Sequence, residues 1–398
     1  MSPAGPDDIG SPLVRRFVGS DRYYKERAAR KAILLYINTP LCNSIGMAGL
    51  TLVPRDLAET REQLRGWVER RFGPGATVSE LTAANRAAGW SSETLAFSVH
   101  AGENGAEPRD YVIRIPPAGG GMFAEYDFAG QTRTQELMRR HGVTTPSPVY
   151  YEPDESWIGS RFMVMPRIVG HTPSDTSYAT RGWLHDAGSD VQRRLHDSFL
   201  DTLIAVQRVP VDEAPWLRRP TGFGVGPEIA WWNDYLHWAT DNDVPELMVQ
   251  AFSWLERHQP TDELPPAISW GDARLSNTIS DDTGMIIAAI DWEQACICPA
   301  EADLGWWLAT RRQTLEVQRV RADPELPGFD SREQVVRRYQ DMLGRELQHL
   351  DWFEMFSMAR MACCILRTHV LLRRLGLTDH GFLRAPVMPS WAVETIRR

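Results

Sequence analysis

The stretch that decides the fold of this chain is ISWGDARLSNTISDDTGMIIAAIDWEQACICPAEADL, residues 268–304. Its pattern predicts a loop, a hairpin whose turn is the DDTG of residues 281–284, and a second loop beside the first. A hairpin brings the residues before its first strand next to those after its second. We therefore expect Asp272, Asn277 and Asp291 to converge at one end of it.

These residue types suit phosphoryl transfer. One carboxylate can orient the accepting hydroxyl and take its proton, while an amide oxygen and a second carboxylate hold Mg²⁺ against the nucleotide phosphates. Two protein ligands are enough, because Mg²⁺ keeps several of its waters. The alternative is an ordinary hairpin, since Asp and Asn are common turn residues. The spacing alone leaves both explanations open.

Three motifs carry a resemblance to a known family: WGDARLSN at 270–277, IDWEQA at 290–295 and PAEADLGWW at 299–307. Together they resemble the catalytic core of the aminoglycoside phosphotransferase-like family, small-molecule kinases with a protein-kinase-like fold. The resemblance is closest to a bacterial branch related to the kinase-like domain fused to some acyl-CoA dehydrogenases. It covers residues 56–375, most of the chain.

The resemblance implies roles for residues of the core. Asp272 would be the catalytic base, Asn277 and Asp291 the Mg²⁺ ligands, and Asp303 a structural brace of the catalytic loop. The usual His of the family's HGD is Trp270 here. That His is generally a scaffold residue, so its replacement leaves catalysis possible.

The nucleotide site would lie in a β-rich lobe. Small residues of the 85–94 loop let backbone N–H groups approach phosphates, and Ser91 and Ser92 can add hydroxyl donors. Arg114 lies where kinases use a Lys to hold phosphates, and Gln131 lies where they use a Glu. Gln131 can hydrogen-bond Arg114 but cannot neutralise it. A plain hairpin turn and a strand-edge Arg paired with a surface acid are the alternatives.

The strand 161–165 leads into the expected hinge between the lobes. There Met165, Pro166 and Ile168 would present backbone groups to adenine. Pro166 has no N–H, but a carbonyl at this position and an N–H from Ile168 are sufficient. The alternative is a proline that simply ends a strand.

The acceptor site is less defined. Residues 231–264 carry seven acids and one base. In the family that the chain resembles, this insert lines the acceptor site, and acids there would suit a cationic sugar. A solvated helix face explains the charges equally well. Tyr235, His237 and Trp238 are candidates for substrate contact, with a place in the core as the alternative, because buried aromatic residues usually pack in the core. Arg360 and Arg367 share a helix face and would bind an anionic acceptor or cap carbonyls.

Composition limits the class of protein. The chain has 398 residues, 43% of them hydrophobic, and a net charge of -9, which argues against a nucleic-acid partner. Five cysteines without a CxxC indicate buried free thiols in a reducing cytosol, hence a cytoplasmic protein. No apolar run reaches the ~18–20 residues of a membrane span, so we expect no stable membrane insertion. Nothing in the sequence fixes an oligomeric state.

The sequence thus predicts an α+β, two-lobed protein-kinase-like fold. Residues 1–54 would be a partly disordered extension, 55–165 a nucleotide-binding lobe with a leading helix, and 166–398 a helical lobe with the catalytic loop and acceptor site. The expected reaction moves the γ-phosphoryl group of ATP, or of GTP, to a hydroxyl of a small molecule with Mg²⁺ as cofactor. The alternatives are a hydroxyacid or acyl-thioester-linked kinase and a nucleotide-binding pseudokinase with a regulatory role.

Overall fold

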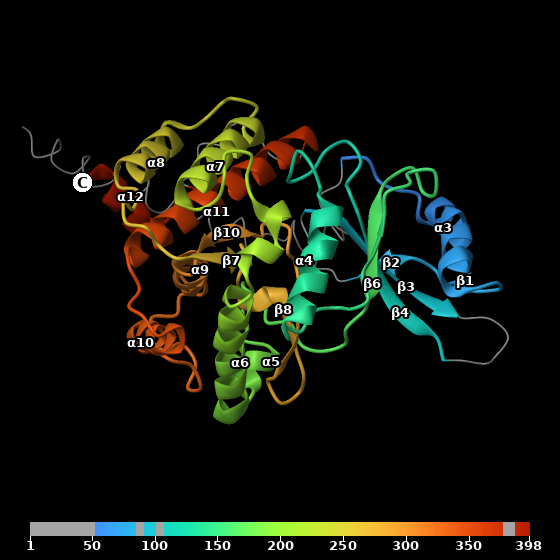
Figure 1. Cartoon of the computed structure of the whole chain (residues 1–398), viewed down its shortest axis with the longest axis horizontal. Coiled ribbons are helices and arrows are strands. Elements are labelled where there is room, and N and C mark those ends of the chain that lie inside the picture. The colour runs from blue at the N-terminus through green and yellow to red at the C-terminus, as the bar shows by residue number, and fades with distance from the viewer. Residues whose placement is uncertain (1–51, 85–90, 101–106, 377–386) are drawn as a thin grey trace, which may run out of the picture.

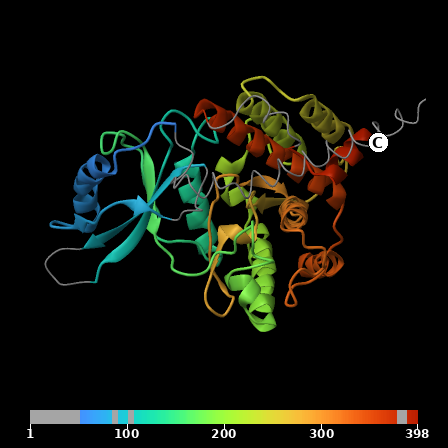
Figure 2. The ribbon, with the colours of Figure 1, turned by 180° about the vertical axis from the view of Figure 1, so that it is seen from behind.

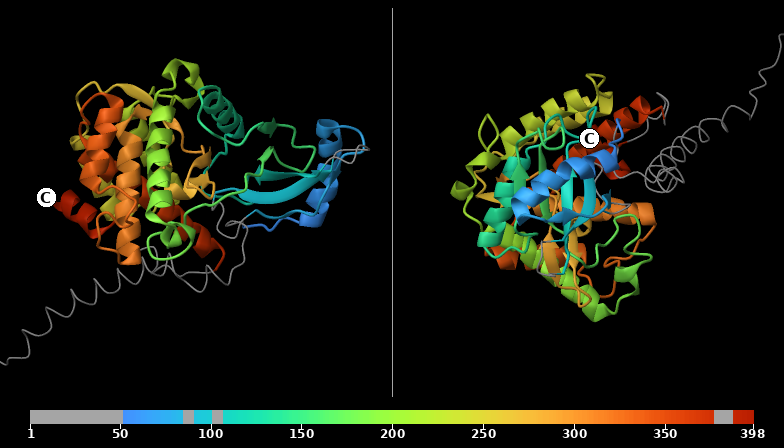
Figure 3. Two further views of the ribbon diagram at one scale, coloured as in Figure 1. Left: turned by 90° about the horizontal axis from the view of Figure 1, so that it is seen from below. Right: turned by 90° about the vertical axis from the view of Figure 1, so that its right-hand side faces the viewer.

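The computed structural model describes residues 52–84, 91–100, 107–376 and 387–398. A small lobe built on an antiparallel sheet adjoins a larger helical lobe (Figure 1). In the left view of Figure 3 the sheet lies at one end of the molecule, with the blue helix of residues 57–72 beside it, and the helices of the larger lobe lie at the other. The two-lobed α+β fold predicted from the sequence is confirmed. Expectations for residues 1–51, 85–90 and 101–106 lie outside the described residues.

The small lobe begins with helix α3 (Leu57–Phe72). Its N-cap is Asp56, whose carboxylate accepts the backbone N–H groups of Ala58 at 2.9 Å and Glu59 at 3.0 Å. The helix packs on the sheet through an apolar face that includes the fully buried Leu64. Leu57, in the solvated first turn, is 38% exposed and does not belong to this face.

The sheet places Arg114 centrally. Its order is β1-β3-β4-β6-β5, with β2 beside β3, and every pairing is antiparallel. Arg114 on β4 lies opposite Thr94 of β3 and Met163 of β6, so it does not lie at a sheet edge. The strands are β1 (Thr77–Val78), β2 (Thr82–Ala83), β3 (Glu93–His100), β4 (Arg109–Ile115), β5 (Tyr150–Glu152) and β6 (Phe162–Pro166).

Helix α4 (Phe128–Arg140) joins the two lobes. Phe128 packs in a small cluster with residues of β6, whereas Leu137 and Met138 belong to the core of the helical lobe. The helix therefore has apolar partners on both sides of the cleft, which fixes Gln131 between them.

The helical lobe surrounds the catalytic segment. Its long helix α11 crosses behind α7 and α8 in Figure 1 and is largely buried. The helices are α5 (Trp183–Asp186), α6 (Ser189–Gln207), α7 (Val225–Ala239), α8 (Glu246–Arg257), α9 (Glu301–Gln318), α10 (Arg332–Leu343), α11 (Leu350–Arg374) and α12 (Ser390–Arg397). Among the described residues, α11 is long and apolar enough to cross a membrane by length and composition, but 83% of its apolar window is buried in the protein.

The hairpin predicted from the sequence forms as β8 (Thr278–Ser280) and β9 (Ile286–Ala289). Its turn is held by Asp281, whose carboxylate accepts the backbone N–H groups of Thr283 and Met285 at 2.9 and 3.0 Å. Strand β7 (Pro266–Ser269) precedes the hairpin in the sequence and β10 (Cys296–Pro299) follows it, and these two strands pair with each other. Seen from behind, the hairpin lies beside α6 on the side of the small lobe (Figure 2).

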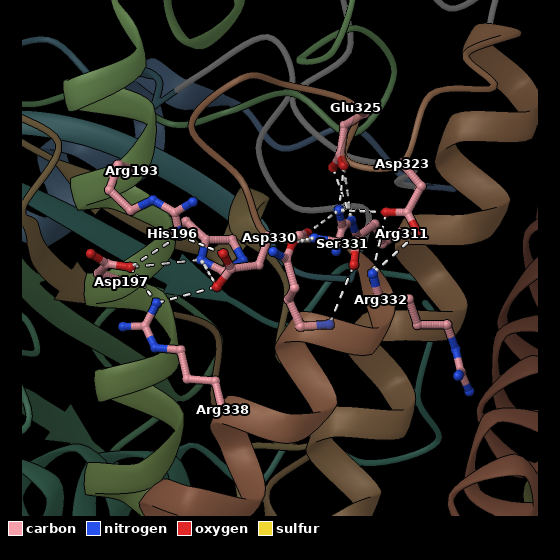
Figure 4. A network of polar contacts seen from close by, with 11 residues as sticks. Arg193, His196, Asp197, Arg311, Asp323, Glu325, Asp330, Ser331, Arg332 and Arg338 are labelled. Carbon is pink, nitrogen blue, oxygen red and sulfur yellow. Dashed lines mark hydrogen bonds and ion pairs between the residues drawn. The ribbon is translucent and has the colours of Figure 1, made fainter.

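A network of charged side chains ties together the base of the helical lobe (Figure 4). We call it the basal network. Arg311 of α9 pairs with the buried Glu325, and Arg338 of α10 pairs with Asp197 of α6. Its remaining members include Arg193, His196 and Asp330. It fixes the loop between α9 and α10 against α6.

Candidate active site

The loop, hairpin and second loop bring the three predicted residues together. The side-chain amide of Asn277 donates to the backbone carbonyl of Asp272 at 2.9 Å. The backbone N–H of Ile290 donates to the carbonyl of Asn277 at 2.9 Å. This bond brings Asp291, which follows Ile290, close to Asn277. Asp291 has a left-handed backbone, with φ of 64°. Such a conformation costs free energy in a non-glycine residue and is often found at functional sites.

Trp270 connects the two loops. Its indole N–H donates to the carbonyl of Ile290 at 3.0 Å, and its ring stacks on Trp292 with centroids 5.2 Å apart. Trp270 therefore links the catalytic loop to the segment that carries Asp291. This gives a physical reason why the replacement of the family's His preserves the scaffold.

Asp303, at the start of α9, braces the same loop. Its carboxylate accepts the Ser269 hydroxyl at 2.7 Å and the backbone N–H groups of Trp270 and Gly271 at 2.8 and 3.0 Å. Gly271 has φ of 86°, and a Cβ there would lie 2.1 Å from the carbonyl oxygen of Gln294. The loop thus requires glycine immediately before Asp272.

The Asp272 carboxylate is held on both oxygens. Oδ1 accepts the indole N–H of Trp306 at 2.9 Å and lies 2.9 Å from Nε of Arg274. Oδ2 accepts from Nη2 of Arg274 at 3.0 Å. Asp272 is only 5% exposed. A base in this position has a fixed orientation and little competing water.

Arg114 is the centre of a buried polar cluster across the cleft, which we call the cleft cluster. Its guanidinium donates to Asp291 Oδ1 at 3.1 Å, to Glu293 Oε2 at 3.0 Å and to Gln131 Oε1 at 3.3 Å. Burial lowers the pKa of Arg114, but Asp291 and Glu293 raise it more, so it stays above its ordinary value. The predicted contact between Gln131 and Arg114 is present, and carboxylates from the second loop supply the neutralising charge.

The two serines complete this cluster. Nε of Arg114 donates to the Ser92 hydroxyl at 2.9 Å, and the Ser91 hydroxyl donates to Glu293 at 2.7 Å. Both serines are buried, and the phenol of Tyr126 donates to the Ser91 carbonyl. Their hydroxyls were predicted to donate to phosphates, whereas in this structure they bind Arg114 and Glu293.

The hinge residues lie at the end of β6. Met165 pairs with Val112 and Pro166 with Tyr111 in the sheet, and Met165 is 8% exposed. Ile168 follows after Arg167, whose N–H donates to the carbonyl of Asp110 at 2.9 Å. Nothing in this geometry conflicts with their predicted role.

The candidate acceptor residues lie in different environments. All seven acidic residues of the 231–264 segment are exposed, so a solvated helix face accounts for their charges. Tyr235 is buried and donates to the carbonyl of Met122 at 2.7 Å. This bond and one from Arg367 to the carbonyl of Gly121 at 2.8 Å fix the Pro/Gly loop of residues 116–122, before α4, to α7 and α11.

Arg360 and Arg367 are structural. Arg360 is 3% exposed, donates to the carbonyl of Gly271 at 2.6 Å, and lies 4.5 Å from the ring of Trp306. Arg367 lies 4.0 Å over the ring of Trp238. Both guanidinium groups cap carbonyls, which is the second of the two alternatives left open by the sequence, and both also stack on aromatic rings.

Sequence reasoning missed two residues. Glu293 binds Arg114 and Ser91, and burial together with Asp291 raises its pKa against the opposing effect of Arg114. Arg274 binds Asp272, and burial lowers its pKa less than Asp272 and Asp175 raise it. Their signal was their location inside the two motifs, each two residues from an assigned position.

The donor types fit a divalent cation. Because the Nδ2 of Asn277 is engaged by Asp272, its Oδ1 is the acceptor left for a ligand, and Asp291 supplies a carboxylate beside it. Mg²⁺ favours such hard oxygens and keeps waters as its other ligands. Within the part of the chain that the structure describes, no group of three or more His, Cys, Asp or Glu residues could hold a metal by itself.

Comparisons with known proteins find relatives among curated proteins and among solved structures. Among curated proteins, acyl-CoA dehydrogenase family member 11 from Homo sapiens and that from Pongo abelii are each 26% identical over 206 residues. The match covers 49% of this chain and 24% of theirs, so the chain spans about a quarter of the length of these relatives.

Solved structures show the fold. A Ralstonia eutropha protein assigned as an aminoglycoside phosphotransferase matches with a TM-score of 0.61 at 19% identity, over 84% of this chain and 98% of that one. Macrolide 2'-phosphotransferase type I matches with a TM-score of 0.50 at 15% identity, over 87% and 99%. The model of the phosphotransferase enzyme family (APH) matches residues 82–339, well over half of the chain. The chain therefore belongs to the phosphotransferase enzyme family and has its kinase-like fold.

Proposed function

We propose that the protein is a Mg²⁺-dependent phosphotransferase that moves the γ-phosphoryl group of ATP, or of GTP, to a hydroxyl of a small molecule. The observation that carries this proposal is the convergence of Asp272, Asn277 and Asp291 at one end of the hairpin, opposite Arg114. Membership of a phosphotransferase family supports the reaction type. Fold alone would not, because one fold hosts many activities.

Asp272 is the candidate base. Trp306 and Arg274 fix its carboxylate, and the remaining lone pairs can accept the proton of the acceptor hydroxyl. General-base catalysis depends on this orientation, and positioning supplies most of the rate enhancement in phosphoryl transfer.

Asn277 and Asp291 would hold Mg²⁺, which neutralises phosphate charge when bound. Asp291 pairs with Arg114 in this structure, so Mg²⁺ and Arg114 would compete for the carboxylate of Asp291. A phosphate group offers Arg114 an alternative anionic partner of matching geometry. Ser91 and Ser92 lie beside Arg114 and would contact the phosphates together with it. Met165, Pro166 and Ile168 would contact the purine ring of the nucleotide at the hinge.

The acceptor is a small molecule with a hydroxyl group. The acids of residues 231–264 are exposed and give no support to an acidic lining for a cationic acceptor. Arg360 and Arg367, which an anionic acceptor would have needed, are bound to backbone carbonyls. The structure thus favours neither of the charged acceptor classes through these residues.

The test is calorimetric titration of ATP, and separately GTP, into the protein with and without Mg²⁺. We expect binding that requires Mg²⁺ and is lost in Asp291→Asn. The matched control is Asp282→Asn, because Asp282 lies in the turn at the other end of the same hairpin with its side chain 96% exposed. Failure of both nucleotides to bind the wild-type protein would exclude the proposal, as would equal Mg²⁺-dependent binding to Asp291→Asn.

A further inference from the structure

The loop between β6 and α5 lies against the catalytic hairpin. His171 and Ser280 exchange backbone hydrogen bonds of 2.7 and 2.9 Å, so the start of this loop is joined to β8. The side chain of Gln318 on α9 donates to the carbonyl of Asp175 at 3.1 Å. Asp175 is therefore fixed through its backbone, independently of what its carboxylate binds.

The carboxylate of Asp175 binds two residues of the catalytic loop. Its Oδ2 accepts from Nη1 of Arg274 at 2.7 Å and from the hydroxyl of Ser276 at 2.8 Å. Both partners lie between the candidate base and the candidate metal ligand in the sequence. The loop thus has an anionic anchor that comes from outside the recognised motifs.

Arg274 lies between two carboxylates. Nη1 donates to Asp175 and Nη2 donates to Oδ2 of Asp272 at 3.0 Å, while Nε lies 2.9 Å from Oδ1 of Asp272 without hydrogen-bond geometry. A guanidinium has donors on fixed edges, so the partner on one edge determines the direction of the others. Asp175 consequently restrains the edge that Arg274 presents to Asp272.

We propose that Asp175 is a positioning residue that acts through Arg274 to orient the carboxylate of Asp272. This inference rests on the proposed function, in which Asp272 is the base. Without Asp175, the guanidinium keeps one anionic partner and is free to shift over both oxygens of Asp272, where it obstructs the approach of the acceptor hydroxyl. The defect then lies in turnover and not in nucleotide affinity.

A purely structural role for Asp175 is the competing explanation, and Gln318→Ala is the matched control for it. This variant removes the bond to the Asp175 backbone but leaves the carboxylate contacts in place. We expect Asp175→Ala to reduce kcat for Mg·ATP hydrolysis, with water as acceptor, by about 10²-fold, the loss typical of a displaced catalytic group. KM for Mg·ATP stays unchanged, Asp175→Glu recovers part of kcat, and Gln318→Ala retains wild-type kcat.

The decisive comparison uses Arg274→Met. If Asp175 acts only through Arg274, adding Asp175→Ala to Arg274→Met lowers kcat no further. Two losses that multiply would overturn the inference, and so would an increase in KM with unchanged kcat. Equal loss of kcat in Gln318→Ala and Asp175→Ala would likewise assign Asp175 to simple loop support.

Hydrogen–deuterium exchange of residues 272–278 provides a readout that needs no turnover. We expect faster exchange in Asp175→Ala and in Arg274→Met, with no further increase in the double variant. Failure of the proposed function has a different signature: a wild-type protein that neither binds nor hydrolyses Mg·ATP. Failure of this inference is an active wild-type protein whose Asp175→Ala variant matches it in kcat and in exchange.

Discussion

The cleft cluster and the basal network use the same chemistry for different ends. In each, an arginine is buried against carboxylates: Arg114 against Asp291 and Glu293, and Arg311 against Glu325. The basal network connects helices and the loop between them (Figure 4). The cleft cluster instead connects residues that have candidate roles in the reaction.

The difference lies in which partners can be exchanged. Mg²⁺ could replace Arg114 as the partner of Asp291. A phosphate could replace Asp291 as the partner of Arg114. Both ligands belong to the proposed reaction. Nothing in that reaction offers Arg311 or Glu325 a substitute. Breaking a buried ion pair on one side leaves the other charge uncompensated, which is strongly destabilising. We therefore expect the cleft cluster to control activity and the basal network to control stability.

The largest effect that this comparison predicts is on turnover. Asp272→Ala removes the candidate base, and we expect Mg·ATP hydrolysis to fall by about 10³-fold, within the range that general-base catalysis contributes. Nucleotide affinity, measured by calorimetry, is unchanged because Asp272 is assigned no contact with the nucleotide. Equal hydrolysis rates in the variant and the wild type would remove Asp272 from this role.

The second effect is on stability. Arg311→Met leaves the buried Glu325 without its charged partner, and we expect the free energy of unfolding to fall by about 3 kcal/mol in urea titrations. Calorimetric affinity for Mg·ATP stays at the wild-type value. Arg312→Met is the control on the same helix, because Arg312 is half exposed and its pair with Glu316 is 3.8 Å long. A loss of Mg·ATP affinity in Arg311→Met would break the distinction between the two regions.

The sequence predicted the parts of the site that depend on local patterns. The hairpin predicted around DDTG forms, with β8 (Thr278–Ser280) ending directly before that turn, because a short β-branched segment on each side of DDTG specifies a hairpin. The facing of Gln131 and Arg114 followed from the family frame, and the structure has this contact at 3.3 Å. Local turn chemistry was sufficient for the hairpin, whereas the contact between Gln131 and Arg114 was implied by the family resemblance.

Contacts between distant segments were not predictable in this way. Asp175 and Arg274 lie 99 residues apart, and nothing in either segment marks the other as its partner. The Pro/Gly loop before α4 looked flexible by composition. Its fixed position depends on Tyr235 and Arg367, which are 113 and 246 residues from the carbonyls they bind. Composition describes what a segment does alone, whereas these contacts depend on the packed helical lobe.

The smallest expected effect is a pH dependence of stability that arises in the basal network and not in the cleft cluster. His196 of the basal network is fully buried and faces Asp330, Asp197, Arg193, Arg338 and Arg311. Burial outweighs Asp330 and lowers its pKa from 6.5 to about 4. Because the unfolded chain binds this proton more tightly, His196 lowers stability as the pH falls from 6.5 towards 4.

As the pH falls from 7 to 5, His196 should reduce the free energy of unfolding by about 2 kcal/mol. His196→Phe cannot take up the proton, and the ring retains contact with Phe329, whose centroid is 4.9 Å from that of His196. We therefore expect a shallower decline in its urea-measured stability over this interval. Parallel pH profiles for the variant and the wild type would contradict the argument. Mg·ATP affinity at pH 7 should be the same in both proteins, since His196 is neutral there and the cleft cluster does not include it.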